Sequence, residues 1–158
     1  PLVKSTVEEE KPTSLPAPDY LNGTEMILLA EDEEDVRNLT KSLLEEAGYE
    51  VMEAVDGYDT INKFMENKDN INLLLLDVIM PTKNGREAYK EIRKIRPDIK
   101  ALFMSGYSES GIHQKTILKE GLHFISKPFS QTALLKNVRE ILDNSIAVAR
   151  TSVRRTAT

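Results

Sequence analysis

The segment Leu73–Pro81, with the sequence LLLLDVIMP, joins four consecutive leucines to a carboxylate at Asp77 and ends on a proline. A short apolar run that stops at a turn signal is typical of a strand buried on both faces of a parallel sheet. We therefore expect Asp77 to lie where a central strand ends. Ligands of open α/β sheets bind beyond the carboxyl ends of the strands, so this position predicts a functional site.

Other apolar runs also end on polar side chains: Met26–Ala30 precedes Glu31 and Asp32, Ala101–Met104 precedes Ser105, and Phe124–Ser126 precedes Lys127. Parallel strands end at the same edge of a sheet, so these side chains predict a single pocket. Three carboxylates that lie close together repel one another, and a hard divalent cation relieves that repulsion. We expect magnesium, with manganese as the alternative, because Mg²⁺ prefers oxygen ligands and bridges carboxylates to phosphoryl oxygens.

Between these runs the apolar residues follow helical spacing. Helices are expected at about Glu33–Ala47, Tyr58–Asn67, Gly85–Ile95 and Ile112–Glu120, and after an N-cap at Ser130, with a further strand at Glu50–Ala54. On the first two helices, the residues expected to face inward are Val36, Leu39, Leu43, Leu44, Ile61, Phe64 and Met65. Five strand–helix units predict a three-layer α/β sandwich with a five-stranded parallel sheet. The flavodoxin-like order 2-1-3-4-5 places the first and third strands side by side, which brings Glu31, Asp32 and Asp77 together.

Composition limits the other function classes. The 158 residues carry a net charge of −5, which argues against nucleic acid as a direct partner. The absence of cysteine excludes disulfides, thiolate nucleophiles and Cys-ligated zinc. No apolar run reaches the length of about 18 residues that a membrane span needs, and Pro1–Lys11 does not resemble a signal peptide. We expect a cytoplasmic domain with no direct membrane contact.

Proline content and charge suggest the domain boundaries. Residues 1–23 hold four of the seven prolines and the acidic run Glu8–Glu10, so we expect a disordered linker. Residues 24–144 form the predicted domain, and residues 145–158 form a C-terminal tail.

Carboxylates can act as nucleophiles toward phosphoryl groups and form an aspartyl phosphate. Asp77 is the best candidate because it comes from the central strand, with acids on one side and Lys127 and Ser105 on the other. Taken alone, Asp77 would fit a helix cap or a turn equally well. The polar residues at three other strand ends favour a functional site over a helix cap or a turn.

The chain resembles the receiver domain of response regulators in two-component signalling. The resemblance covers roughly residues 24–144 and rests on five motifs in order: Glu31-Asp32, Asp77–Pro81, Asn84-Gly85, Ser105-Gly106 and Lys127-Pro128-Phe129. It implies that Asp77 accepts a phosphoryl group, and that Glu31, Asp32, Asp77 and the backbone carbonyl of Ile79 surround Mg²⁺. It also implies that Ser105 and Lys127 bind the phosphoryl group, that the Lys127-Pro128 bond is cis, and that Ser105 and Phe124 form a conformational switch.

Some positions depart from the commonest pattern of that family. The acid pair is Glu-Asp, so Glu31 is expected to reach the metal through water. Ser105 lacks the methyl group, and Phe124 lacks the tyrosine hydroxyl, of the commonest form of the switch. Ile79 and Tyr107 lie where the family controls attack by water, and we hypothesise that their bulk gives the acyl phosphate a long lifetime.

The resemblance also implies the partners. The phosphoryl group is expected from the phosphohistidine of a kinase dimerisation domain. Neither His113 nor His123 lies on a long amphipathic helix like the one that carries the histidine in such a domain. A histidine phosphotransfer domain is the expected next acceptor. We expect the parent protein to be a hybrid sensor histidine kinase, itself a candidate for membrane anchoring, with a single-domain regulator as the alternative.

Two other readings have different functions. A pseudo-receiver would keep the fold and act only through its partner surface, but it would not need all of Asp32, Asp77, Ser105 and Lys127. A flavodoxin-like nucleotide binder would need a glycine-rich loop after the first strand. The acidic run Glu31–Asp35 there has the opposite electrostatic character.

Overall fold

A computed structural model describes the backbone of residues 18–106 and 110–157 and the side chains of residues 18–106 and 115–144. One sheet of five parallel strands runs through it in the order β2-β1-β3-β4-β5. The strands are β1 (Met26–Ala30), β2 (Glu50–Ala54), β3 (Ile71–Asp77), β4 (Lys100–Ser105) and β5 (His123–Ser126). The predicted fold class and strand order are confirmed.

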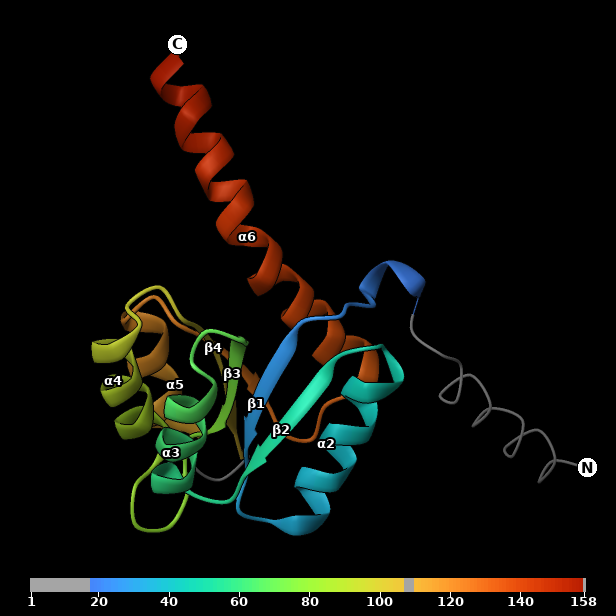
Figure 1. Ribbon diagram of the computed structural model, residues 1–158, viewed down its shortest axis with the longest axis vertical. Coiled ribbons are helices and arrows are strands. Elements are labelled where there is room, and N and C mark those ends of the chain that lie inside the picture. Colours follow the sequence, from blue (N-terminus) through green and yellow to red (C-terminus); the bar gives the residue numbers. More distant parts are fainter. Residues whose placement is uncertain (1–17, 107–109, 158) are drawn as a thin grey trace, which may run out of the picture.

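Helices cover both faces of this sheet (Figure 1). In chain order they are η2 (Asp19–Leu21), α2 (Glu34–Glu46), α3 (Gly57–Asn67), α4 (Gly85–Ile95), α5 (Ser110–Lys119) and α6 (Gln131–Ala157). One apolar cluster joins the sheet to α2 and α6, and a second joins it to α3, α4 and α5. None of these helices, within the part of the chain described, is long and apolar enough to cross a membrane.

The central strand β3 supplies side chains to both clusters. Leu73 and Leu75 pack on the side of α2 and α6, whereas Leu74 and Leu76 pack on the opposite side. All four are fully buried. Because successive side chains of a strand alternate between the faces, a continuous leucine run is what a two-sided core requires.

Local signals set the helix ends. Asp56 caps α3 by accepting a hydrogen bond from the Asp59 amide at 2.8 Å, and Ser130 caps α6 by accepting one from the Ala133 amide at 3.1 Å. Asn84 and Glu87 form a capping box on α4, which the sequence analysis did not identify. Gly48, after α2, has a φ of 100°, the left-handed conformation expected of a helix stop.

Two inward positions were predicted wrongly. Leu39 is 59% exposed and Met65 is 50% exposed. Thr40, next to Leu39, is buried instead, and its hydroxyl donates to the Val36 carbonyl at 2.7 Å. On α3 the buried face carries Phe64 and Thr60, and the Thr60 hydroxyl donates to the Asp56 carbonyl at 2.6 Å. Because these bonds satisfy the hydroxyls locally, threonine can face the core, and Leu39 lies at the edge of the buried stripe of α2.

Both ends of the domain differ from the expected boundaries. Asp19–Leu21 forms the 3₁₀ helix η2, and Leu21 is buried in the cluster with α6. Ordered structure therefore begins within the predicted linker, whose residues 1–17 lie outside the described part. At the other end, the backbone of α6 continues as a helix past Asn144, through the predicted tail, to Ala157.

Arg139 ties α6 to the start of the sheet. Its guanidinium donates to both carboxylate oxygens of Glu25 at 2.9 Å, to Asp143 at 2.8 Å and to the Tyr49 hydroxyl at 3.0 Å. These hydrogen bonds hold the pKa of Glu25 below its ordinary value. The lowered pKa makes the interaction stabilising above the unfolded-state pKa of Glu25, and the stabilisation is lost as the pH falls through the folded-state pKa.

We predict that Arg139→Met lowers the free energy of unfolding by about 1–2 kcal/mol at pH 7. The difference from wild type should narrow below about pH 4, because protonated Glu25 no longer pairs with Arg139. Urea unfolding across this pH range measures the difference, with Lys136→Met, which removes an exposed cation of the same helix, as the control. A difference that is independent of pH would mean that Arg139 stabilises through the packing of its stem alone.

Candidate functional site

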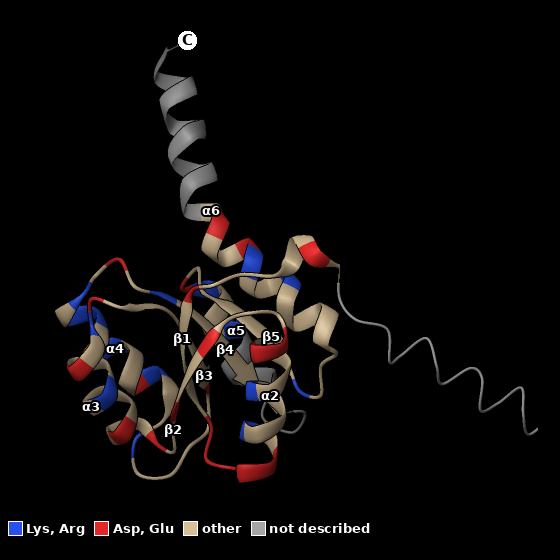
Figure 2. Ribbon diagram, turned by 45° about the vertical axis from the view of Figure 1, so that its right-hand side comes forward, with Lys and Arg blue, Asp and Glu red and all other residues tan. Residues whose placement is uncertain are grey.

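The strand ends bring the predicted polar residues to one edge of the sheet. Parallel pairing aligns Ala30 at the end of β1 with Leu76 in β3, so Glu31 and Asp77 follow side by side. Asp32 is the next residue, and acidic positions continue into the start of α2 (Figure 2). Ser105 ends β4, and Lys127 follows β5.

The three predicted acids form one cluster. Glu31, Asp32 and Asp77 each offer a carboxylate oxygen within 4.8 Å of the others. Glu31 and Asp77 are buried, whereas Asp32 is exposed. An exposed acid beside two buried ones leaves a side open to solvent, which suits an ion such as Mg²⁺ that keeps several waters.

Lys127 is the cation of this cluster. Its Nζ lies 3.1 Å from Oε1 of Glu31 and 3.2 Å from Oδ2 of Asp77. The Lys127-Pro128 bond is cis, as predicted, and the Lys127 amide donates to the Ser105 carbonyl at 2.8 Å. This hydrogen bond connects the end of β5 to the end of β4.

Charge in this cluster is not balanced by Lys127 alone. Burial, with a contribution from Asp77, raises the pKa of Glu31, and burial also raises the pKa of Asp77. The pKa of Lys127 is raised as well: burial lowers it, but the neighbouring Asp77 and Glu31 outweigh that effect. Because two buried carboxylates share one ammonium group, a bound divalent cation would stabilise their ionised forms. The donor set therefore fits a hard divalent metal ion.

The remaining predicted residues lie in different environments. The Ile79 amide donates to Oδ1 of Asp77 at 3.3 Å, and the Ile79 side chain is 41% exposed. Ser105 is fully buried, and its hydroxyl donates to the Gly106 carbonyl at 3.3 Å. Phe124 is partly buried on β5, against the cluster that contains Phe103. Tyr107 and the side chain of His113 lie outside the described residues, and His123 is exposed.

Some residues that support the site were not identified from the sequence. Arg37 donates from Nη1 to the Glu31 carbonyl at 2.8 Å and pairs through Nε with Glu53 at 3.2 Å. Gly85 lies so close to the Asp77 backbone that an added Cβ would be 2.2 Å from the Asp77 carbonyl oxygen. Helix spacing places Arg37 on the face of α2 near β2. Sequence spacing alone does not reveal the close approach of the Gly85 backbone to the Asp77 backbone, eight residues earlier.

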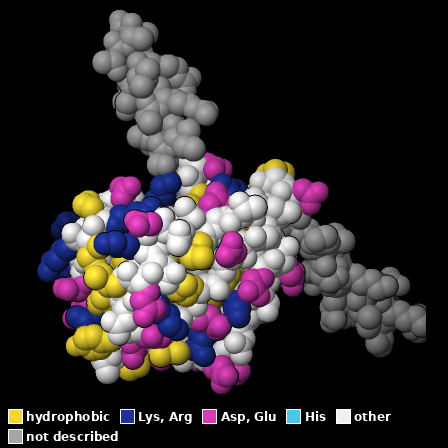
Figure 3. Space-filling view, in the orientation of Figure 1, with side chains coloured by type: hydrophobic (Ala, Val, Ile, Leu, Met, Phe, Trp, Pro, Cys, Tyr) yellow, Lys and Arg dark blue, Asp and Glu magenta, His cyan; other side chains and the backbone are white. Residues whose placement is uncertain are grey.

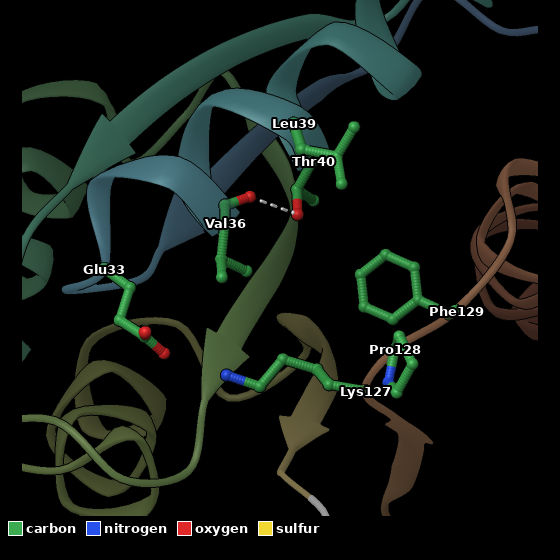
Figure 4. Close-up of a pocket in the computed structure, with 7 residues that line it drawn as sticks. All are labelled: Glu33, Val36, Leu39, Thr40, Lys127, Pro128 and Phe129. Carbon is green, nitrogen blue, oxygen red and sulfur yellow. Dashed lines mark hydrogen bonds between the residues drawn. The ribbon is translucent and has the colours of Figure 1, made fainter.

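A groove of about 270 Å³ opens beside Lys127. Glu33, Val36, Leu39 and Thr40 line it from the start of α2, and Lys127, Pro128 and Phe129 line it from the loop between β5 and α6 (Figure 4). Four of these seven side chains are apolar, and the exposed Leu39 is one of them. The acidic cluster is therefore reached beside an apolar surface.

Comparison with known proteins relates most of the chain to one protein family. The response regulator receiver domain family matches residues 27–139. The sensor kinase CckA of Brucella abortus is 35% identical over 123 residues, which cover 78% of this chain and 13% of the kinase. The chemotaxis protein CheY of Thermotoga maritima is 31% identical over 116 residues, which cover 73% of this chain and 95% of CheY.

Solved structures show the same relationship. A response regulator receiver domain protein from Clostridium thermocellum has a TM-score of 0.70 at 28% identity and covers 78% of this chain and 98% of that structure. The receiver domain of the hybrid histidine kinase CckA has a TM-score of 0.62 at 32% identity, with 74% of this chain and 98% of that domain covered.

The chain spans only a small part of CckA, and 55% of the regulatory protein VanRB of Enterococcus faecalis, which is 35% identical over 124 residues. The relatives that this chain covers almost completely, such as CheY and the receiver domain of CckA, are single receiver domains. With the fold and the acidic cluster described above, this shows that the chain belongs to the response regulator receiver domain family of two-component systems.

Proposed function

We propose that Asp77 is the phosphoacceptor of this receiver domain. The observation that supports this assignment most strongly is the contact of Lys127 with both Asp77 and Glu31 at the carboxyl ends of the strands. A buried carboxylate that lies beside an ammonium group, with two further acids within 4.8 Å, is positioned for attack on an electrophilic phosphorus. In the proposed reaction, a carboxylate oxygen of Asp77 bonds to phosphorus as the bond between phosphorus and the imidazole nitrogen of a phosphohistidine breaks.

The residues around Asp77 have separate roles in this proposal. Glu31, Asp32, Asp77 and the backbone carbonyl of Ile79 would hold Mg²⁺, which supplies positive charge toward the phosphoryl oxygens when it is bound. Lys127 neutralises charge on another phosphoryl oxygen, which requires it to exchange part of its contact with Asp77. Ser105 donates its hydroxyl to a third oxygen. The protein thus positions the group and neutralises its charge, and Asp77 does the covalent chemistry.

Phosphorylation is then expected to change the shape of the neighbouring face. Ser105 would exchange its bond to the Gly106 carbonyl for one to the phosphoryl group. Phe124 lies one strand away and is only partly buried, so it can change rotamer when β4 shifts. A ligand that binds one conformation better shifts the population toward it, and the phosphoryl group would act here as that ligand.

The proposed context is the receiver of a hybrid sensor histidine kinase in the cytoplasm. The similarity to CckA, at 35% identity, supports this proposal. The donor would be the phosphohistidine domain of the kinase, and a histidine phosphotransfer domain would accept the group next. A single-domain regulator is the alternative, supported by CheY and by the regulator CpdR of Brucella abortus, of which the chain covers 95%.

Mass spectrometry of the intact chain with acetyl phosphate and Mg²⁺ tests this function. We expect a gain of one phosphoryl group in the wild type and none in Asp77→Asn. Asp32→Asn should slow the gain by roughly tenfold or more, because a metal ligand is lost. Asp35→Asn removes the same charge from an exposed position outside the cluster and should leave the rate unchanged.

If the wild type gains no phosphoryl group, and beryllofluoride also does not bind, the chain acts as a pseudo-receiver. A gain of phosphoryl mass that persists in Asp77→Asn would instead show that another residue is the acceptor.

The exposed side chain of Ile79 allows a test of phosphoryl lifetime. We predict that Ile79→Asn speeds dephosphorylation several-fold, because an amide in place of a bulky alkyl group admits and orients water at the acyl phosphate. The rate is measured from the decay of the phosphorylated mass after the donor is removed. Ile95→Asn makes the same change at an exposed position at the far end of α4 and serves as the control. Equal rates in wild type and Ile79→Asn would refute the shielding role.

A further inference from the structure

A second polar pocket lies between α4 and the segment that follows α5. Its volume is about 330 Å³, and it is lined by Arg86, Tyr89, Lys90, Arg93, Glu120 and Leu122. It shares no residue with the site at Asp77, and it faces the opposite side of the sheet from α2 and α6. A function proposed for this pocket can therefore fail without affecting the phosphoacceptor proposal.

Three of the lining side chains are cations on one face of α4. Arg86, Lys90 and Arg93 are spaced four and three residues apart, so they lie in a row about 10 Å long. Glu120 is the one acid among the lining residues. Basic side chains gather over α4 in the space-filling view (Figure 3), although the whole chain has a net charge of −5. A concentrated positive surface on an acidic protein attracts anions to that location.

The guanidinium group of Arg86 keeps at least one N–H donor without a partner among the described residues. Its Nη2 lies 2.7 Å from Oε2 of Glu120, while its buried Nε has no hydrogen-bond partner among the described residues. A guanidinium has five N–H donors and binds carboxylate or phosphate best through two of them. Because Glu120 is 42% exposed, an anion from solvent can compete with it for Arg86.

Arg93 is held in place by an aromatic ring. Its guanidinium carbon lies 5.5 Å from the centroid of the Tyr89 ring. That ring is itself buried and meets Phe103 edge to face at 5.5 Å. A guanidinium that is held against a fixed ring loses little freedom on binding and still offers its N–H groups to a phosphate. Tyr89 and Leu122 also give the pocket an apolar wall.

We propose that this pocket binds a small ligand through a di- or triphosphate group. A row of two arginines and one lysine suits several linked charges better than a single one, and arginine forks match phosphate oxygens. The volume lies at the lower end of small-ligand sites, which favours a compact phosphorylated molecule over a folded partner. The phosphate chain replaces Glu120 at Arg86 and contacts Lys90 and Arg93.

Amide-resolved NMR titration of the full chain with inorganic pyrophosphate, at 0.15 M salt and without divalent cations, tests this proposal. We expect chemical-shift changes centred on α4 and residues 120–122. Lys90→Gln and Arg93→Gln should each weaken binding by roughly tenfold, as expected for the loss of a charged hydrogen bond. Glu120→Gln should strengthen binding, because it removes the competing carboxylate.

Lys94→Gln is the matched control. Lys94 is on the same helix and is 75% exposed, but it does not line the pocket, so the variant should change binding by about twofold at most. If Lys94→Gln weakens binding as much as Arg93→Gln, the attraction is a general charge effect and the site is refuted. The absence of shifts on α4 at millimolar pyrophosphate would also refute it.

Parallel titrations with ADP identify which part of the ligand is recognised. Tighter binding of ADP than of pyrophosphate, with added shifts at Tyr89 and Leu122, would assign a nucleotide. Equal binding would assign recognition to the phosphate chain alone. Tighter binding of a hexaglutamate peptide at the same residues would overturn the phosphate class in favour of an acidic polypeptide.

Discussion

The structure depends most on two buried carboxylates that share one ammonium group. Glu31 and Asp77 follow neighbouring parallel strands, and Lys127 contacts both of them within 3.2 Å. Burial raises the pKa of each acid, so the arrangement carries an electrostatic cost in the absence of further positive charge. A bound divalent cation would meet this demand, because it adds positive charge beside the two carboxylates. In the proposed function, the cost of burying the acids would favour the metal-bound form.

The rest of the fold holds these groups in place. The leucines of β3 fill both faces of the sheet, and the pairing of Leu76 with Ala30 places Asp77 beside Glu31 at the strand ends. Gly85 lets α4 begin against the Asp77 backbone, where a larger residue would collide with the carbonyl oxygen. The hydrogen bond from the Lys127 amide to the Ser105 carbonyl connects the last two strands at the site.

Sequence reasoning predicted the elements that rest on strong local patterns. The β3 leucine run and the glycine and proline stops predicted the strands and helices, and the polar residues at the strand ends predicted the members of the acidic cluster. The sheet order came from the one doubly wound arrangement that brings those strand ends together. Leu39 was placed in the core because apolar spacing cannot show that the hydroxyl of the neighbouring Thr40 is satisfied on the helix backbone. The contacts of Arg37, and the gathering of Arg86, Lys90 and Glu120 in one pocket, depend on tertiary packing between segments that are far apart in the sequence.

The central claim is that Asp77 itself carries the phosphoryl group. The most direct measurement is borohydride reduction of the chain after transfer from a phosphohistidine donor, followed by peptide mass spectrometry. Borohydride converts an aspartyl phosphate to homoserine, so the modified residue is identified in the peptide sequence. The account predicts homoserine at position 77 alone. Reduction at Glu31 or Asp32, or phosphate that survives on a serine or histidine, would contradict it.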